Sequence, residues 1–347
     1  NDGQVELLVD HVEGEDIVCV CANDGIVKNK RGINVPGIKL GFDYLSEKDI
    51  ADITFGCEQG VNFIAASFVR RAQDVLDVKK LLIENGRPDI QIIAKIENSE
   101  GVENMDEILK VADGIMVARG DLGVEVPAED VPLIQKEIIK KCRAVGKVVI
   151  TATQMLDSMQ ENPRPTRAEV SDVANAIFDG TDAIMLSGES AQGKYPEEAV
   201  MTMTKIALKT EETLDYDALL RKAIRTAPED PSEAICMSVA EIASKFSVAA
   251  IIVYTESGST AKRVSRYRPE SMVIAATPYE PVTRSLALNW GVKGVVCKQM
   301  RDRVAQIEYA QILAKENGVE PGEQILITAG TPGVGGTTSY LELITVK

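Results

Sequence analysis

Histidine, tryptophan and paired cysteines are scarce in this sequence. It has one histidine, His11, one tryptophan and six cysteines in 347 residues, and no two cysteines are spaced as C-x-x-C. This scarcity excludes a zinc or haem site and a histidine-dependent triad from the chemistries to be considered. The cysteines are predicted to be reduced thiols, which is typical of a cytoplasmic protein.

Long apolar runs and a surplus of basic residues are also missing. No run reaches the roughly 18 apolar residues that a membrane-spanning helix needs, so no membrane association is expected. The formal net charge is −15. A protein that binds nucleic-acid phosphates would carry a basic surface, so nucleic acid is not an expected partner. Local cations, backbone amides or a metal can still bind a phosphate-bearing metabolite in an acidic protein.

The order of apolar and polar segments predicts an α/β protein in three parts. Residues 1–36 contain short strands and turns, and this segment is too small to fold alone. Between residues 37 and 215, five apolar strands each precede an amphipathic helix, which indicates a parallel sheet covered by helices. The strands are expected at 63–68, 90–97, 114–118, 147–153 and 183–187, and the helices at 74–84, 102–111, 131–145, 169–178 and 196–213. Part of a (β/α)8 barrel and an open doubly wound sheet both fit this spacing. Residues 216–347, with a polar loop at 225–231, are predicted to form a separate α/β domain.

The ends of consecutive predicted strands carry the first candidate site residues. Lys95 and Glu97 are two residues apart at the end of one strand, so they face the same side. The next strand runs into Arg119, Gly120 and Asp121, and Asp121 is expected beside Glu97, roughly 5 Å away in backbone spacing. Two carboxylates there suit Mg²⁺, and the neighbouring glycines let amide groups approach an anion. A surface ion pair and an ordinary turn would explain either motif alone, but the two together favour a site.

Two further segments add weaker signals. Thr153 ends the third strand with a hydroxyl suited to orienting a substrate or relaying a proton, although threonine is common in strands. The loop 162–169 holds two prolines and two arginines, and Thr166 with Glu169 has the pattern of a capping box. This loop fits a site or subunit contact and a solvated surface loop equally well.

Two loops in residues 216–347 are rich in hydroxyl groups and glycine. The first links a strand to a helix, whose N-terminus can bind an anion. Its residues are Thr255, Ser257, Gly258, Ser259 and Thr260. The second, 330–338, includes Gly333 and Gly335; it has the glycine spacing of a P-loop but lacks the lysine and precedes a strand, so it is not a Walker A site. Together the loops predict a phosphate pocket, and two ordinary turns are the alternative.

Several long motifs, in this order, resemble the pyruvate kinase family along essentially the whole chain. They are NKRGINVPG from residue 29, FIAASFVR from residue 63, AKIEN from residue 94, ARGDLG from residue 118 and the stretch 151–190. The resemblance implies a partial TIM (β/α)8 barrel at 37–215, a remnant of an inserted small β domain at 1–36 and a C-terminal α/β allosteric domain at 216–347.

The resemblance also implies Mg²⁺-dependent phosphoryl transfer from phosphoenolpyruvate to ADP, which gives pyruvate and ATP as the last step of glycolysis. Lys95 matches the catalytic lysine that steadies the transferring phosphoryl group, and Thr153 matches the hydroxyl near the carbon that is protonated. Glu97 and Asp121 match the ligands of Mg²⁺, which Mn²⁺ could replace. The implied substrate-binding residues are Ala118, Arg119, Gly120, Asp121 and Thr153.

The family further implies a cytoplasmic homotetramer that depends on K⁺. The two hydroxyl-rich loops correspond to its sugar-phosphate effector pocket, with fructose 1,6-bisphosphate as the hypothetical ligand. The family's first three barrel strands and its K⁺ ligands have no counterpart in this sequence. An unclosed barrel exposes strand edges, so this chain alone is expected to be inactive or insoluble, unless it is part of a longer protein.

Two other functions remain open from the sequence. A Mg²⁺-dependent enolate lyase or aldolase of a related barrel type also uses Glu and Asp at successive strand ends, but it does not require Lys95. A regulatory or degenerate paralogue would use only the C-terminal domain to sense a phosphate ligand. The intact set of Lys95, Glu97, Asp121 and Thr153 argues against such decay.

Overall fold

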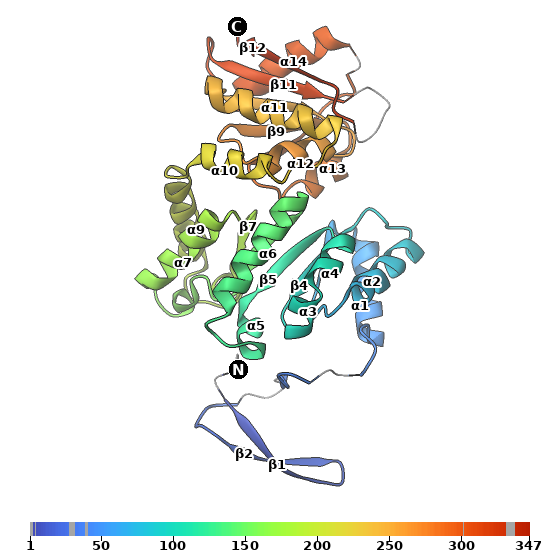
Figure 1. Ribbon diagram of the computed structural model, residues 1–347, viewed down its shortest axis with the longest axis vertical. Helices are drawn as coiled ribbons and strands as arrows, with labels where there is room; N and C mark the ends of the chain where they lie inside the picture. The colour runs from blue at the N-terminus through green and yellow to red at the C-terminus, as the bar shows by residue number, and fades with distance from the viewer. Residues whose placement is uncertain (1–2, 4, 28–31, 39–40, 301, 331–336) are drawn as a thin grey trace.

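The computed structural model describes residues 3, 5–27, 32–38, 41–300, 302–330 and 337–347. Its strands form three separate sheets: a two-stranded hairpin, a five-stranded parallel sheet and a second five-stranded sheet (Figure 1). Each sheet lies within one of the three predicted ranges, although the domain boundaries themselves stay a prediction. Among the described residues, no helix is both long and apolar enough to cross a membrane.

The first sheet is an antiparallel hairpin of β1 (Leu7–Glu13) and β2 (Asp16–Cys21), which projects away from the other two sheets in Figure 1. Apolar side chains of both strands are exposed, among them Val9 and Val12. A two-stranded ribbon has no second layer to cover its faces, so it adds little stability by itself.

The central sheet has five parallel strands in the order β3-β4-β5-β6-β7, which confirms the predicted strand–helix repeat. All residues of β5 and β6 are buried, as is typical of parallel strands covered on both faces. The strands are β3 (Phe63–Ala66), β4 (Gln91–Ile96), β5 (Gly114–Ala118), β6 (Val148–Ala152) and β7 (Ala183–Met185). The alternating helices are α2 (Ala72–Glu84), α4 (Met105–Val111), α6 (Val131–Val145), α7 (Arg167–Asp179) and α9 (Pro196–Glu211).

Some helices differ from the prediction. α1 (Glu47–Gln59) precedes β3 and was not predicted. It has no continuous apolar face, because Cys57 is its one buried residue. The single helix expected at 102–111 is wrong: α3 (Ser99–Glu103) and α4 are separated at Asn104, whose side chain donates a hydrogen bond to the Arg70 carbonyl. Three short helical segments were not predicted. They are α5 (Arg119–Glu125), the 3₁₀ turn η1 (Asp157–Gln160) and α8 (Gly188–Ala191).

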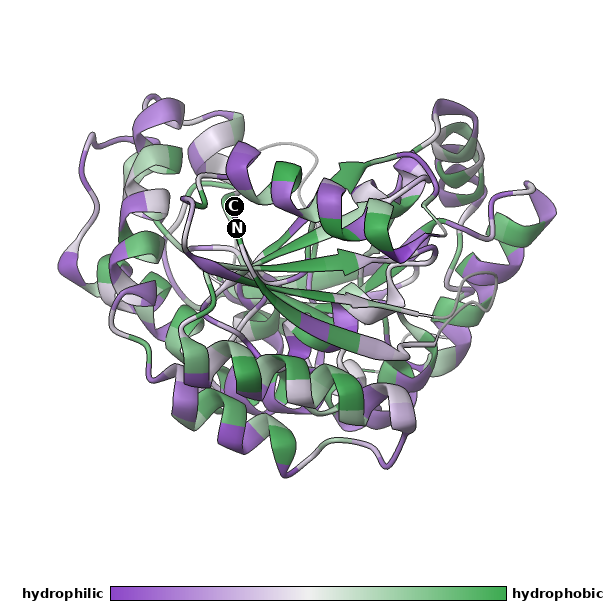
Figure 2. Ribbon diagram, turned by 90° about the horizontal axis from the view of Figure 1, so that it is seen from above, coloured by the Kyte–Doolittle hydropathy of each residue, from purple (hydrophilic) through white to green (hydrophobic). Residues whose placement is uncertain are grey.

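β3 and β7 form the outer edges of the central sheet, and no other strand of the described residues pairs with either edge. The sheet is therefore an open, barrel-like layer, in agreement with the predicted partial barrel. Figure 2, seen from the end of the molecule that carries the C-terminus, shows mostly hydrophobic strands at the centre and helices that mix hydrophobic and hydrophilic residues around them. This distribution is expected when amphipathic helices cover buried parallel strands.

The third sheet has the order β10-β9-β8-β11-β12, and only β12 runs antiparallel to its neighbour. The predicted polar loop lies between two helices of this α/β unit, α10 and α11. The strands are β8 (Ala250–Tyr254), β9 (Met272–Thr277), β10 (Val292–Val296), β11 (Gln324–Ala329) and β12 (Tyr340–Thr345). The helices are α10 (Tyr216–Ile224), α11 (Pro231–Phe246), α12 (Ser259–Arg266), α13 (Glu280–Ser285) and α14 (Arg303–Glu316).

Two arginines at the C-terminal end of α12, Arg266 and Arg268, join this unit to the central one. Arg266 donates to the carbonyl of Ala144 at 2.6 Å, near the C-terminal end of α6. Arg268 donates to the carbonyl of Gly180 at 3.1 Å, at the end of α7, and pairs with Asp182 at 2.9 Å. Helix C-termini present unpaired carbonyls and the negative end of the helix dipole, so arginines are favourable partners there. The third sheet therefore docks at the amino ends of the central strands.

Gly180→Ala tests how closely this junction is packed. Gly180 has φ +94°, and an added Cβ would lie 2.7 Å from Arg143 Nη1 and 3.0 Å from Arg143 Cδ. Gly86→Ala is the matched control, since Gly86 has φ +68° and its Cβ would meet no described atom within 4 Å. Both variants carry the left-handed backbone cost of about 1–2 kcal/mol. Gly180→Ala is expected to lose about 1–2 kcal/mol more in the free energy of unfolding, because its methyl group overpacks the site.

Urea unfolding followed by the fluorescence of the single tryptophan, Trp290, would measure both losses. Trp290 is suitable because its ring lies 5.1 Å from the Arg268 guanidinium at the same junction. Equal losses in the two variants would show that Arg143 does not restrict Gly180.

Candidate active site

Lys95 and Glu97 lie together at the carboxyl end of β4, as the two-residue period predicts. Lys95 Nζ is 2.8 Å from Glu97 Oε1, and the Glu97 side chain is only 1% exposed. The ammonium group also donates to Ser67 Oγ at 2.9 Å, while its side chain stays 22% exposed. A buried carboxylate needs a compensating charge and hydrogen bonds, and Lys95 supplies part of both. The pair thus presents a fixed, partly exposed cation at this end of the sheet.

The segment after β3 completes the surroundings of Glu97. The backbone N–H of Phe68 donates to Glu97 Oε2, and Phe68 has φ +52°. Tyr44 fixes the same segment through a 2.6 Å hydrogen bond from its hydroxyl to the Ser67 carbonyl. Burial, and then the nearby Asp74 and Glu97, raise the pKa of Tyr44. The sequence analysis missed Ser67, Phe68 and Tyr44 as site residues, although the motif at residue 63 contains the first two.

Asp121 lies near this pair in the sheet order, but on a helix. Ile96 is the register partner of Val117, so the carboxyl ends of β4 and β5 are adjacent. The strand β5 ends at Ala118, and α5 begins at once, with Asp121 in its first turn. The sequence analysis predicted no helix at this position. Burial, and then the charge of Asp121, raise the pKa of Glu125 at the end of α5.

Thr153 connects the end of β6 to α5. Its hydroxyl accepts a hydrogen bond from Gly120 N at 2.7 Å and donates to the Ala152 carbonyl at 2.6 Å. Thr153 and Gln154 have φ +68° and +53°, a region that L-residues seldom occupy. Each such residue costs on the order of 1–3 kcal/mol, so surrounding contacts must hold it in place.

The Arg119 side chain provides several of those contacts. Its guanidinium donates to the carbonyls of Thr153 at 2.8 Å and Ala152 at 3.3 Å, and it pairs with Asp172 of α7 at 2.6 Å. Arg119 thus fastens the strained segment after β6 to α5 and α7. Of the predicted substrate-binding backbone, Ala118 is fully buried, and the Gly120 amide is the donor to Thr153.

Glu189 is a further buried carboxylate, in a strand end whose sequence is only a weak signal of a site. It is 1% exposed and accepts hydrogen bonds from Leu156 N at 3.1 Å and Ser187 N at 2.8 Å. These bonds link the segments after β6 and β7. The signal in the sequence was a glutamate just after a strand end, the same pattern that marks Glu97.

The loop 162–169 behaves as its capping pattern predicts. Thr166 accepts from Glu169 N, and the Glu169 side chain accepts from Thr166 N, which starts α7. Glu169 also binds Ser158, and despite its burial these hydrogen bonds lower its pKa. Arg164 and Arg167 are exposed, so the loop presents both cations at the surface.

In the third sheet's unit, the first hydroxyl-rich loop lies against the end of the second. Thr260 Oγ1 is 2.9 Å from Thr338 Oγ1, while Thr255 Oγ1 accepts from Gly258 N at 2.9 Å. Ser257 donates to Ser259 at 3.2 Å, and α12 begins at Ser259 without a side-chain cap. Gly333 and Gly335 lie outside the described residues. The structure therefore brings the described ends of the two loops together.

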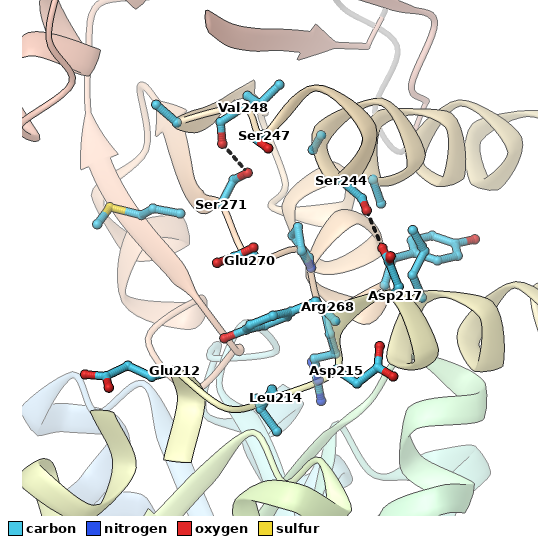
Figure 3. A pocket seen from close by; sticks show the side chains of 18 residues that line it. Glu212, Leu214, Asp215, Asp217, Ser244, Ser247, Val248, Arg268, Glu270 and Ser271 are labelled. Atoms are coloured by element: carbon cyan, nitrogen blue, oxygen red, sulfur yellow. Dashed lines mark hydrogen bonds between the residues drawn. The ribbon is translucent and has the colours of Figure 1, made fainter. Parts of the chain in front are cut away.

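A pocket of about 610 Å³ lies elsewhere, between the segment before α10 and the unit of the third sheet (Figure 3). Carboxylates line it, among them Asp215, Asp217 and Glu270, and Asp217 accepts a hydrogen bond from Ser244. None of the residues predicted for phosphoryl transfer lines this pocket. The candidate active site is thus the group of side chains at the carboxyl ends of β3 to β6, at the opposite end of the central strands.

Comparison with known proteins identifies the family of the chain. The family model for the pyruvate kinase barrel domain matches residues 1–200, and the model for the pyruvate kinase alpha/beta domain matches residues 233–344. Proteins named pyruvate kinase from Clostridium perfringens and Clostridium acetobutylicum are 52% and 50% identical to the chain; the alignments cover 99% and 100% of it and 73% and 74% of those proteins. A pyruvate kinase from Geobacillus stearothermophilus is 53% identical over 99% of the chain and 59% of its own length. Because the two models match most of the chain and these relatives share about half of its residues, the chain belongs to the pyruvate kinase family.

Proposed function

We propose that the pyruvate kinase reaction takes place at the carboxyl ends of β4, β5 and β6. In this reaction a phosphoryl group passes from phosphoenolpyruvate to ADP, and pyruvate and ATP are formed. The observation that carries the proposal is the pair of Lys95 with the almost fully buried Glu97, 2.8 Å apart. In (β/α)8 enzymes, reacting groups come from the carboxyl ends of several strands.

Lys95 is the proposed catalytic cation. The transferring phosphoryl group carries negative charge on its equatorial oxygens, and a cation fixed in advance stabilises that charge without reorganising. The bonds to Glu97 and Ser67 fix the ammonium group of Lys95, while its partial exposure leaves it accessible to a substrate. A lyase or aldolase transfers no phosphoryl group and would not need this cation.

Mg²⁺, or Mn²⁺ in its place, is the proposed divalent cofactor, held by Glu97 and Asp121. Carboxylate oxygens are the ligands that Mg²⁺ prefers, and one or two of them commonly suffice when water and substrate oxygens complete the shell. Among the described residues, no three His, Cys, Asp or Glu side chains converge as a metal cage. When bound, Mg²⁺ would supply Lewis-acid stabilisation of the anionic oxygens.

Thr153 is proposed to act where the methyl carbon of the product gains its proton. Its hydroxyl is already oriented by Gly120 N and the Ala152 carbonyl. Arg119 is proposed to position it by holding the Thr153 carbonyl, and the backbone from Ala118 to Asp121 is proposed to bind the substrate carboxylate. Strained residues at this strand end support a functional assignment, because strain persists where surrounding contacts impose it.

Other family properties are also proposals for this chain. They include a domain division at residues 36 and 215, a homotetramer, K⁺ dependence and a cytoplasmic location. The loop 255–260, together with Gly333 and Gly335, is proposed to bind a sugar-phosphate effector such as fructose 1,6-bisphosphate. The contact of Thr260 with Thr338 supports that pocket by placing hydroxyls of both loops together.

Lys95→Met tests the catalytic cation. We expect kcat for ATP formation from phosphoenolpyruvate and ADP to fall by about 10²–10³-fold or more, because one charge-stabilising group is lost. Lys293→Met in β10 is the control, a strand lysine of the third sheet bonded to Asn317. Circular dichroism would show that both variants fold. Retained ATP formation in a folded Lys95→Met protein would refute the assignment.

Glu97→Gln and Asp121→Asn test the metal site without an activity assay. Each is expected to weaken Mn²⁺ binding by about tenfold or more, since ligands matter at least as much as the groups that orient them. Mn²⁺ is titrated into the substrate-free protein, and electron paramagnetic resonance measures the unbound Mn²⁺, which gives this affinity. The exposed Glu129 supplies the control Glu129→Gln, which should bind Mn²⁺ as the parent does. Parent-like affinity in both site variants would place the metal elsewhere.

Thr153→Ala and Thr153→Ser separate protonation from phosphoryl transfer. Serine keeps the hydroxyl that meets Gly120 N and the Ala152 carbonyl, whereas alanine removes it. We expect alanine to slow deuterium exchange into the methyl group of pyruvate by about 10²-fold or more, and serine to preserve it within about tenfold. Nuclear magnetic resonance of pyruvate in deuterated buffer follows the exchange. Equal exchange rates in the two variants would remove Thr153 from the protonation step.

A further inference from the structure

The connection that follows β3 is attached to the end of β4 on both sides of one peptide group. β3 pairs with β4 up to Ala66, and farther on the backbone N–H of Val69 donates to the Lys95 carbonyl at 3.3 Å. Between these attachments lies the peptide group that joins Ser67 to Phe68. The chain on either side of this peptide is therefore fixed, and the peptide can reorient only by turning between its two ends.

Both polar groups of this peptide are bonded to side chains. Its N–H, which belongs to Phe68, donates to Glu97 Oε2, and its carbonyl, which belongs to Ser67, accepts a 2.6 Å hydrogen bond from the Tyr44 hydroxyl. The two side chains come from different elements, because Glu97 follows β4 and Tyr44 precedes α1. In a trans peptide the N–H and the carbonyl point in opposite directions, so the two bonds together set the direction in which the peptide faces.

The orientation that these bonds hold is the less favourable of two. Phe68 has φ +52°, in the left-handed region that residues other than glycine seldom adopt. Turning the peptide over would bring this φ to about −130°, in the relaxed β region, and type I and type II turns differ by a rotation of the same kind. The turned peptide would present its carbonyl to the Glu97 carboxylate in place of its N–H. Relaxation of the backbone would thus remove a donor from a buried carboxylate.

The Tyr44 ring is itself held from the side of α2. The Arg70 guanidinium lies 5.8 Å from the ring centroid, which is within the range of a cation–π contact. Arg70 Nε pairs with Asp74 Oδ2 at 3.2 Å, and Asp74 is 2% exposed. Burial, and then the charges of Asp74 and Glu97, raise the pKa of Tyr44, so its hydroxyl keeps the proton that it donates.

We propose that Tyr44 is a positioning residue of the candidate active site, whose hydroxyl keeps the N–H of the Ser67–Phe68 peptide turned toward Glu97. With that N–H in place, one Glu97 oxygen has a backbone donor while the other pairs with Lys95 at 2.8 Å. Lys95 also donates to the hydroxyl of Ser67, so a turn of the peptide would disturb both charged groups. The consequence for catalysis rests on the proposed function, whereas the orientation of the peptide does not.

A tyrosine that only fills space would behave differently. The Tyr44 ring packs against the main apolar core of the central unit, and Tyr44→Phe keeps this ring and removes only the hydroxyl. If packing were its whole role, the peptide would stay as it is in this variant. A positioning role requires that the peptide change its orientation or become mobile.

Nuclear magnetic resonance with ¹⁵N-labelled phenylalanine observes the peptide directly, because the chain has only six phenylalanines. Phe68→Leu identifies the Phe68 amide signal. In Tyr44→Phe, which adds one signal from position 44, we expect the Phe68 amide proton to move upfield and its hydrogen exchange to become about tenfold faster or more, since the bond to a carboxylate is weakened. An unmoved signal with the parent's exchange rate would show that Glu97 alone fixes the peptide, and the proposal would be overturned.

Tyr254→Phe is the matched control. The Tyr254 hydroxyl also donates to a backbone carbonyl at 2.6 Å, that of Gln306, but in the unit of the third sheet. This variant loses the same kind of hydrogen bond and the stability that goes with it. It should nevertheless leave the Phe68 amide signal where the parent has it, which separates positioning from a general loss of stability.

Mn²⁺ binding and turnover test the consequence at the site. In Tyr44→Phe we expect the Mn²⁺ affinity of the substrate-free protein and kcat for ATP formation each to fall by about tenfold, as is common when a group that orients a metal ligand is lost. Tyr254→Phe should keep both values. Parent-like Mn²⁺ affinity in Tyr44→Phe, together with weakened affinity in Glu97→Gln, would contradict the proposal. Parent-like affinity in Glu97→Gln itself would instead refute the proposed metal site, and the Phe68 signal would still decide whether Tyr44 orients the peptide.

Discussion

The carboxylate of Glu97, almost fully buried at the end of β4, is the constraint on which the candidate site depends. An ionised carboxylate in such a place requires a cation and donors, and they come from Lys95 of the same strand and from the Phe68 amide after the neighbouring strand. The segment after β3 must therefore follow a backbone path with Phe68 at φ +52°. Charge compensation, backbone strain and the position of the Lys95 ammonium group are parts of one arrangement, and a change in any of them would alter the others.

Backbone strain in the described residues is confined to two regions. Phe68, Thr153 and Gln154, with positive φ, follow β3 and β6 at the candidate active site. Ser247 and Arg268, the other non-glycine residues with positive φ, line the pocket near the junction. The contacts that impose strain are strong in both regions: Arg119 holds the carbonyls at one end of the central sheet, and Arg268 holds Gly180 and Asp182 at the other. The amino ends of the central strands thus serve docking, and the opposite, carboxyl ends carry the residues proposed for chemistry.

Much of the fold was predictable because its signals are local. Continuous apolar runs gave β3 to β7 within a few residues, and β5 was predicted with both ends correct. Helices with a strong apolar face, such as α6, were equally clear. The pattern failed where burial is slight, as in α1, or where one side chain changes the path, as Asn104 does between α3 and α4. It also missed α5, a short segment with two glycines that packs against α6 and β5.

The sequence by itself determined the pairing of Lys95 with Glu97, because a two-residue spacing on a strand places both side chains on one face whatever surrounds them. It likewise determined the capping of α7 by Thr166 and Glu169. Only the tertiary structure decided that Arg119 meets Asp172, that Glu189 ties together the segments after β6 and β7, and that Tyr44 bonds to the segment after β3. The residues of each such contact are far apart in the chain, and the packing of separate elements brings them together. The hydrogen bond of Arg266 to the Ala144 carbonyl is another example. Local periodicity carries no information about which distant residues come into contact, so these pairs can be identified only from the folded structure.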